Sequence, residues 1–231
     1  MTGKQRNKES QCMAIAGICG AVIYAIADMF LYWGTDIFSK DSTSLWNVPE
    51  WRLMTSMSIG VVGSLLMLLG FISLYRLYDE VFGGIGKLLI TPSFLCMGGV
   101  LYMHFTFGVY SPLTFQSAIR AEVTEAMATE LIQNANAYLE PLSMVLVALG
   151  YFTELVIICG ILSGSFGLKK RTLLYMYVGY ALIFGLFLGI GSITKEWGLA
   201  GSLESLFETT FFIPALLFWK KKAASGRGNR A

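Results

Sequence analysis

Charged residues are scarce in this chain. Only 14% of its 231 residues are Asp, Glu, Lys or Arg, whereas 55% are hydrophobic. A soluble domain carries about 25% charged residues, because its surface must face water. The composition therefore excludes an ordinary soluble domain and indicates an integral membrane protein.

Histidine and cysteine are also rare, with one and four copies respectively. The cysteines show no C-x-x-C spacing, which argues against structural disulfides and zinc knuckles. The sequence also lacks H-E-x-x-H, G-x-S-x-G and Walker spacing. One histidine and several acids are a weak basis for a metal site. We therefore predict no metal site, and the sequence identifies no cofactor.

Long apolar runs are present instead. A helix needs about 20 mostly apolar residues to cross a bilayer. Six such runs occur, at residues 12–33, 53–75, 88–110, 141–163, 172–193 and 199–219. We predict an all-α bundle of six transmembrane helices, with one membrane domain over residues 1–222 and a basic, flexible tail over 223–231. The first run has full spanning length and no signal-cleavage pattern, so we expect it to remain as the first helix.

Basic residues are divided unevenly between the two sides of the predicted bundle. Thirteen of the 17 Lys and Arg residues fall in the two terminal segments and in the second and fourth connections. The other side has only Lys40, Arg52, Arg120 and Lys195. By the positive-inside rule, we predict a multi-pass plasma-membrane protein with both termini in the cytoplasm. The basic tail is expected to anchor this topology beside anionic lipid, and we predict no nucleic-acid partner.

The longest predicted connection spans residues 111–137, on the outer side. It carries strong helix formers, with Ile119, Val123, Met127 and Leu131 at four-residue spacing. We predict a short amphipathic helix over the outer face, between the third and fourth spans. Such a helix either anchors the bundle in the interface or covers an outward cavity.

Five ionisable side chains fall at membrane depth: Asp28, His104, Glu154, Glu204 and Glu208. Inserting a charged side chain near the centre of a membrane helix costs about 2.5 to 3.5 kcal/mol, so each of them needs a hydrogen-bonding partner or water. At a rise of about 1.5 Å per residue, Asp28, His104 and Glu204 lie about 8 to 9 Å below the outer helix ends. By the same count Glu208 lies at about 13 Å and Glu154 at about 20 Å.

These depths predict a polar pocket that opens outward, with Glu154 and Glu208 at its floor. Possible hydrogen-bonding neighbours share the same levels: Tyr24, Tyr102, Tyr151 and Thr209. Each polar residue also has a purely structural explanation, in which it bonds to a neighbouring helix. The lone histidine has no obvious serine partner in the sequence.

Several segments resemble a family of bacterial six-helix membrane proteins without an assigned function. The resemblance lies in Ala27 and Asp28, the glycine-spaced run 60–71 with Leu74 and Tyr75, His104 with Phe105, and residues 202–206. Ala27 departs from the Gly-Asp pair of that family. The resemblance implies the same helical architecture and draws attention to Asp28 and His104, but it implies no activity.

Three functions remain open at this stage. The leading hypothesis is a transporter or solute-binding membrane protein whose acidic pocket takes protons, a cation or a small polar molecule. An intramembrane enzyme would instead use the acids and His104 for acid/base or metal chemistry on a lipid or isoprenoid-like substrate. A non-catalytic scaffold or sensor would use them for helix packing. We expect contact with the lipid bilayer, and a homo-oligomer is possible.

Overall fold

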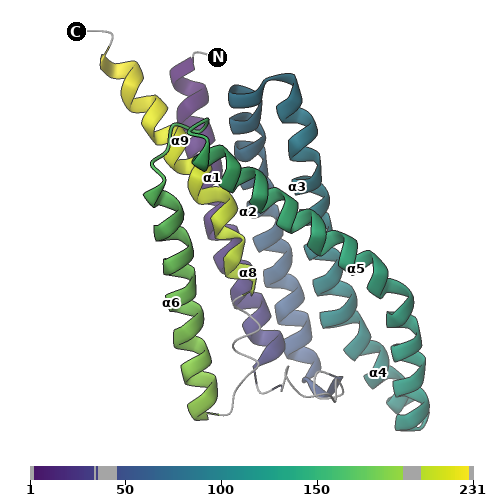
Figure 1. The fold of residues 1–231 in the computed structure, drawn as a ribbon. Helices are drawn as coiled ribbons and strands as arrows, with labels where there is room; N and C mark the ends of the chain where they lie inside the picture. Colours follow the sequence, from purple (N-terminus) through teal and green to yellow (C-terminus); the bar gives the residue numbers. More distant parts are fainter. Residues whose placement is uncertain (1–2, 34, 36–45, 195–203, 229–231) are drawn as a thin grey trace.

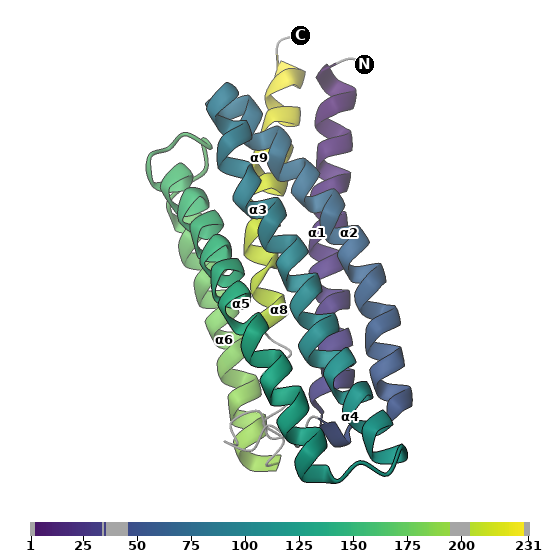
Figure 2. The same cartoon turned by 90° about the vertical axis from the view of Figure 1, so that its right-hand side faces the viewer.

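The computed structural model describes residues 3–33, 35, 46–194 and 204–228. The chain forms an elongated bundle of helices, and both ends of the chain lie at the same end of it (Figures 1 and 2). In the described residues no strand occurs. The all-α prediction is therefore confirmed.

The first half of the bundle consists of three long segments. Helix α1 covers Gly3–Tyr32 and α2 covers Glu50–Phe82. A tight turn at Gly83, with φ of 60°, leads to α3, Gly84–Met103. The chain then continues without a loop through the π-helix η2, His104–Tyr110, and through α4, Ser111–Arg120.

The second half returns through α5, Glu125–Leu162, and α6, Arg171–Thr194. The turn between them contains Gly164 and Gly167, both with positive φ. Beyond residues 195–203 the chain forms a short helix, α8 (Glu204–Phe207), and then α9 (Thr209–Gly228). The α8–α9 segment is interrupted at Glu208.

Five of these helical segments are long and apolar enough to cross a membrane: α1, α2, the continuous segment 84–120, α5 and α6. They indicate a multi-pass membrane protein. The predicted sixth span, 199–219, does not appear as one long helix, because 199–203 lie outside the described residues and the rest is divided at Glu208. Helix α9 also continues to Gly228, while the division into a membrane domain and a flexible tail stays a prediction.

The predicted amphipathic helix between the third and fourth spans is found only in part, since the short helix α4 occurs there but is continuous with the third span. Residues 111–120 extend the third span as α4, and residues 125–137 already belong to α5. The break falls inside the amphipathic pattern, because Glu122 adopts a φ of 64° and Thr124 begins the next helix by accepting a hydrogen bond from Met127 N. Two long helices thus meet in a short hairpin.

Glycines allow α1 and α2 to approach closely. A Cβ atom added to Gly17 would lie 2.6 Å from Cα of Gly70, and one added to Gly20 would lie 2.6 Å from the carbonyl oxygen of Gly63. Small residues permit such backbone contact in membrane helices. The close packing fixes α1 against α2 along much of their length.

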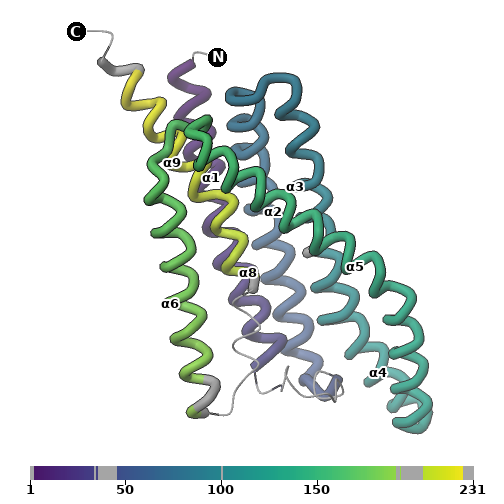
Figure 3. Tube along the Cα trace, viewed as in Figure 1, coloured from purple at the N-terminus to yellow at the C-terminus, as the bar shows by residue number. Residues whose placement is uncertain are grey.

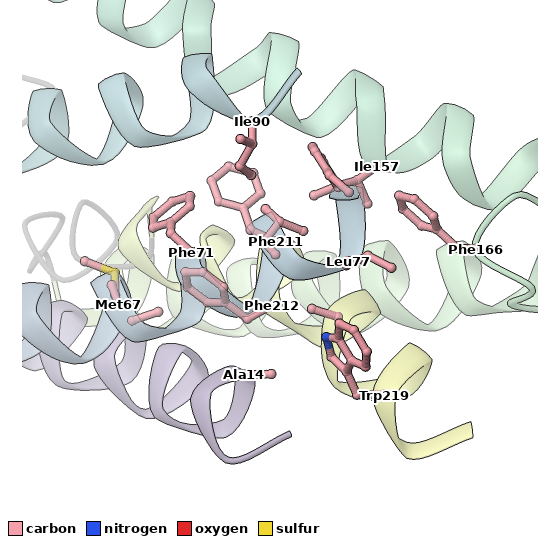
Figure 4. Close-up of a cluster of buried hydrophobic side chains, with 14 of the residues drawn as sticks. Ala14, Met67, Phe71, Leu77, Ile90, Ile157, Phe166, Phe211, Phe212 and Trp219 are labelled. Atoms are coloured by element: carbon pink, nitrogen blue, oxygen red, sulfur yellow. The ribbon is translucent and has the colours of Figure 1, made fainter. Parts of the chain in front are cut away.

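The main hydrophobic core lies toward the end of the bundle that carries both termini. It is formed by residues of α1, α2, α3, α5, α6 and α9, among them Phe71, Ile157, Phe212 and Trp219 (Figure 4). Helix α9 lies beside α1 at this end (Figures 1 and 3). Helix α6 joins α5 at their connecting turn and diverges from it toward the other end (Figure 1).

Candidate functional site

Asp28 is the centre of a buried polar network near the end of α1. The residue is 5% exposed and lies between the fully buried Ala27 and Leu31. Nδ1 of His104 lies 2.8 Å from Oδ1 of Asp28, and the hydroxyl of Ser205 on α8 donates to Oδ2. Both carboxylate oxygens are thus hydrogen-bonded, which compensates a buried charge.

His104 connects this carboxylate to α2. Its Nε2 lies 3.2 Å from Oγ of Ser56, which is fully buried. When Nδ1–H donates a hydrogen bond to Asp28, a neutral imidazole accepts a hydrogen bond from Ser56 at Nε2. The chain Ser205–Asp28–His104–Ser56 therefore joins α8, α1, η2 and α2.

Local backbone features place the imidazole in this position. His104 is the first residue of η2, and the amide of Ser111 donates to the carbonyl of Thr106, five residues earlier, at the end of the π-helix. On α2, a Cβ at Gly60 would lie 3.0 Å from Nε2 of His104, so glycine leaves room for the ring. The ring of Tyr24 packs at 4.8 Å between centroids. Segments of π-helix often occur at functional sites.

A cavity of about 500 Å³ lies beside this network. Its wall includes Asp28 and His104 together with Glu208, which sits at the interruption between α8 and α9. Four tyrosines and three phenylalanines also line the cavity: Tyr24, Tyr32, Tyr151, Tyr180, Phe107, Phe207 and Phe211. Tyr151 is 70% exposed, so the cavity reaches the surface of the bundle along α5.

The structure brings together three of the five acidic or imidazole side chains that the sequence singles out: Asp28, His104 and Glu208. Of the predicted neighbours, Tyr24 and Tyr151 also line the cavity. Glu204 begins α8, but its side chain is not among those described.

Glu154 lies elsewhere, apart from the residues that line the cavity. The hydroxyl of Tyr177 on α6 donates to its Oε1, and Oγ1 of Thr210 on α9 lies 3.1 Å from its Oε2. Glu154 is thus not among the described residues that line the cavity, whereas we expected it at the floor. The position of Glu154 along the helix axis does not predict its neighbours, because these depend on the direction in which the side chain points.

Two predicted neighbours also lie outside the cavity wall. The hydroxyl of Thr209 donates to the carbonyl of Leu206, one turn earlier in the chain. The hydroxyl of Tyr102 is buried and has no hydrogen-bond partner in the described part of the chain. Within residues 3–33, 46–194 and 204–228, no three His, Cys, Asp or Glu side chains converge as metal ligands.

A family model described as a family of unknown function, DUF6796, matches residues 4–222. The chain belongs to the DUF6796 family. The match covers all the helices that line the cavity. No curated protein and no solved structure matches the chain. The resemblance to an uncharacterised family is thus confirmed at the level of DUF6796, which carries no assigned activity.

Sequence reasoning missed two polar members of the network in this DUF6796 chain, Ser56 and Ser205. Ser56 stands one turn before Gly60 on α2, a spacing that is typical of helix packing and conceals its contact with His104. Ser205 lies between Glu204 and Glu208, and the two acids are the more distinctive residues of that segment. Serines are frequent in membrane helices, so neither position carries a distinctive signal.

Proposed function

We propose that this protein is a transporter or solute-binding membrane protein whose cavity takes a small organic cation. The observation that carries the proposal is the composition of the cavity wall, where two carboxylates, Asp28 and Glu208, face an aromatic enclosure. Among the described residues that line it there is no lysine or arginine.

Electrostatics favours a cationic ligand. Asp28 receives its hydrogen bonds from neutral or weakly basic groups, His104 and Ser205, so its negative charge is not cancelled by a lysine or arginine in the described network. Charge interactions are stronger in a low-dielectric site than in water. A cation in the cavity would therefore gain attraction from Asp28 and Glu208.

The aromatic wall favours an organic cation over a bare metal ion. Aromatic faces attract organic cations, and the interaction strengthens when water is excluded. The cavity volume of about 500 Å³ lies within the usual range for small-molecule sites. The exposed rim at Tyr151 and Val147 suits a cation with an apolar body that arrives through the bilayer.

Two irregularities in the helices occur at the cavity. One is the π-helix that begins at His104, and the other is the interruption at Glu208. Interrupted helices commonly form the solute sites of transporters, since they allow the backbone to depart from regular hydrogen bonding beside a cavity. These irregularities support the transporter version of the proposal.

The test is binding of tetraphenylphosphonium to the purified protein in detergent, with neutral tetraphenylmethane as the comparison. We expect saturable binding of the cation only, and a loss of about tenfold or more in affinity for Asp28→Asn and for Glu208→Gln. The matched control is Glu50→Gln, which changes a surface acid paired with Arg120. Equal binding of the neutral compound, or unchanged affinity in both variants, would overturn the proposal.

Transport is tested separately from binding. Proteoliposomes should accumulate tetraphenylphosphonium under an imposed proton gradient faster than liposomes that contain the Asp28→Asn variant. Binding without accumulation would exclude transport of this probe and would support the solute-binding version of the proposal.

One geometric observation favours a second candidate, an intramembrane acyl hydrolase or acyltransferase. Asp28, His104 and Ser56 follow one another in the order of a catalytic triad, with 2.8 Å at Nδ1 and 3.2 Å at Nε2. However, Ser56 is fully buried and does not line the cavity, so a substrate has no path to its Oγ. Labelling by a fluorophosphonate that Ser56→Ala abolishes and Ser58→Ala retains would favour the enzyme.

A further inference from the structure

Glu154 is a buried acid that the cavity does not explain. The residue is 5% exposed and belongs to α5, yet the partners of its side chain are on α6 and α9. Ile157, three residues further along α5, is fully buried. An ionised carboxylate without a cation is costly in such a place.

The hydroxyl of Thr210 has two acceptors within reach, the carbonyl of Phe207 and the carboxylate of Glu154. Oγ1 of Thr210 lies 2.6 Å from the carbonyl oxygen of Phe207 and 3.1 Å from Oε2 of Glu154. A threonine hydroxyl has one proton to donate and two lone pairs that accept. With an ionised Glu154, the hydroxyl donates to Oε2. When Thr210 instead keeps its proton on the nearer acceptor, the Phe207 carbonyl, its oxygen is free to accept a hydrogen bond from a protonated Glu154.

We propose that Glu154 is a proton-binding site, separate from the cavity, whose protonation controls the hydrogen bond between Thr210 and Phe207. In the protonated form, Glu154 donates to Thr210, and Thr210 donates to the Phe207 carbonyl. Loss of the proton to water makes both Glu154 oxygens acceptors, so the Thr210 hydroxyl turns toward Oε2 and releases the carbonyl.

The groups that face Glu154 fit a proton rather than a metal or organic cation. They are the hydroxyls of Tyr177 on α6 and Thr210 on α9, while Tyr78 on α2 is within electrostatic reach. The Tyr78 hydroxyl is buried and has no hydrogen-bond partner in the described residues. Among those residues, no ion pair includes Glu154.

The position of Thr210 connects this site to the cavity. Thr210 holds the carbonyl of Phe207, which lies next to the interruption at Glu208. Phe207 and Glu208 both line the cavity. On the other side of the interruption, Ser205 donates to Asp28. Protonation of Glu154 thus acts on the segment that carries two cavity groups. This consequence rests on the proposed function, whereas the proton site itself does not.

Infrared spectroscopy tests the proton site directly. At neutral pH the purified protein should show the carbonyl band of a protonated carboxylic acid, which shifts in D₂O and weakens as the pH is raised. Glu154→Gln should abolish this band, and Asp28→Asn should retain it. Absence of the band in the wild-type protein, or its persistence in Glu154→Gln, would overturn the proposal.

Substitutions at Thr210 provide a second test that keeps the acid in place. Thr210→Val removes the acceptor for the Glu154 proton, so the band should move to higher frequency, whereas Thr210→Ser should keep it unchanged. An unchanged band in Thr210→Val would contradict the proposed hydrogen bond. If the band behaves as expected but tetraphenylphosphonium does not bind, the proton site stands and the proposed function fails.

Discussion

Nδ1 of His104 lies 2.8 Å from Oδ1 of Asp28, and this contact joins the third membrane segment to the first across 76 positions of sequence. Both side chains are more than nine-tenths buried. The pair is therefore a structural connection as well as a part of the cavity wall, and its removal should affect both folding and binding.

Asp28→Ala should lower the free energy of unfolding more than Ser205→Ala does. The first change leaves the Nδ1 proton of His104 and the hydroxyl of Ser205 without their acceptor, at about 1 to 3 kcal/mol for each buried group. The second removes only one donor. Unfolding by SDS titration in mixed micelles measures the difference. Equal stability of the two variants would contradict the network.

Substitution of Gly20 by Val should destabilise the bundle by about 1 to 3 kcal/mol or more, because side-chain atoms would overlap the backbone of α2. Gly185→Ala is the matched control, since a Cβ at Gly185 meets no atom within 4 Å. Thermal unfolding in detergent should separate the two variants. Similar melting temperatures of the two variants would contradict the close backbone contact between α1 and α2.

Removal of an aromatic ring from the cavity should weaken cation binding. Tyr180 packs on Phe207 with ring centroids 5.1 Å apart, and both rings line the cavity. Tyr180→Leu should reduce the affinity for tetraphenylphosphonium between about twofold and about 30-fold, the range of a cation–π contribution. Tyr180→Phe keeps the ring and should bind nearly as well as the wild type. Equal affinities of both variants would exclude this ring from recognition.

The orientation in the membrane can be tested by cysteine labelling. The predicted topology places Ser117 of α4 outside and Ser165, in the turn between α5 and α6, in the cytoplasm. With the four native cysteines replaced, a membrane-impermeant maleimide should label Ser117→Cys in intact cells and label Ser165→Cys only after permeabilisation. The reverse pattern would show that the bundle is inverted.

The sequence predicts the helical segments well because the cost of exposing polar backbone to lipid selects long apolar runs. It predicts their ends poorly. Helix α5 has 38 residues, well beyond the length that a bilayer requires, because polar helix formers extend it back to its N-cap at Thr124. The hydrophobic run alone contains no information about that extension.

The candidate site was predicted in part for a similar reason. Counting residues along each helix estimates the depth of a side chain, and Asp28, His104 and Glu208 do line one cavity. Depth does not determine rotation about the helix axis or which helices are neighbours. The hydrogen-bond partners of Glu154 therefore lie on α6 and α9, outside the cavity wall.

The π-helix at His104–Tyr110 also limits how the length of this segment can vary. One residue turns an α-helix by about 100°, so deleting a single residue here, such as Gly108, would restore a regular helix and rotate everything beyond it relative to His104. Phe115, now packed against Trp46, would then face another direction. The extra residue thus sets the register between the imidazole and the hairpin at the far end of the bundle.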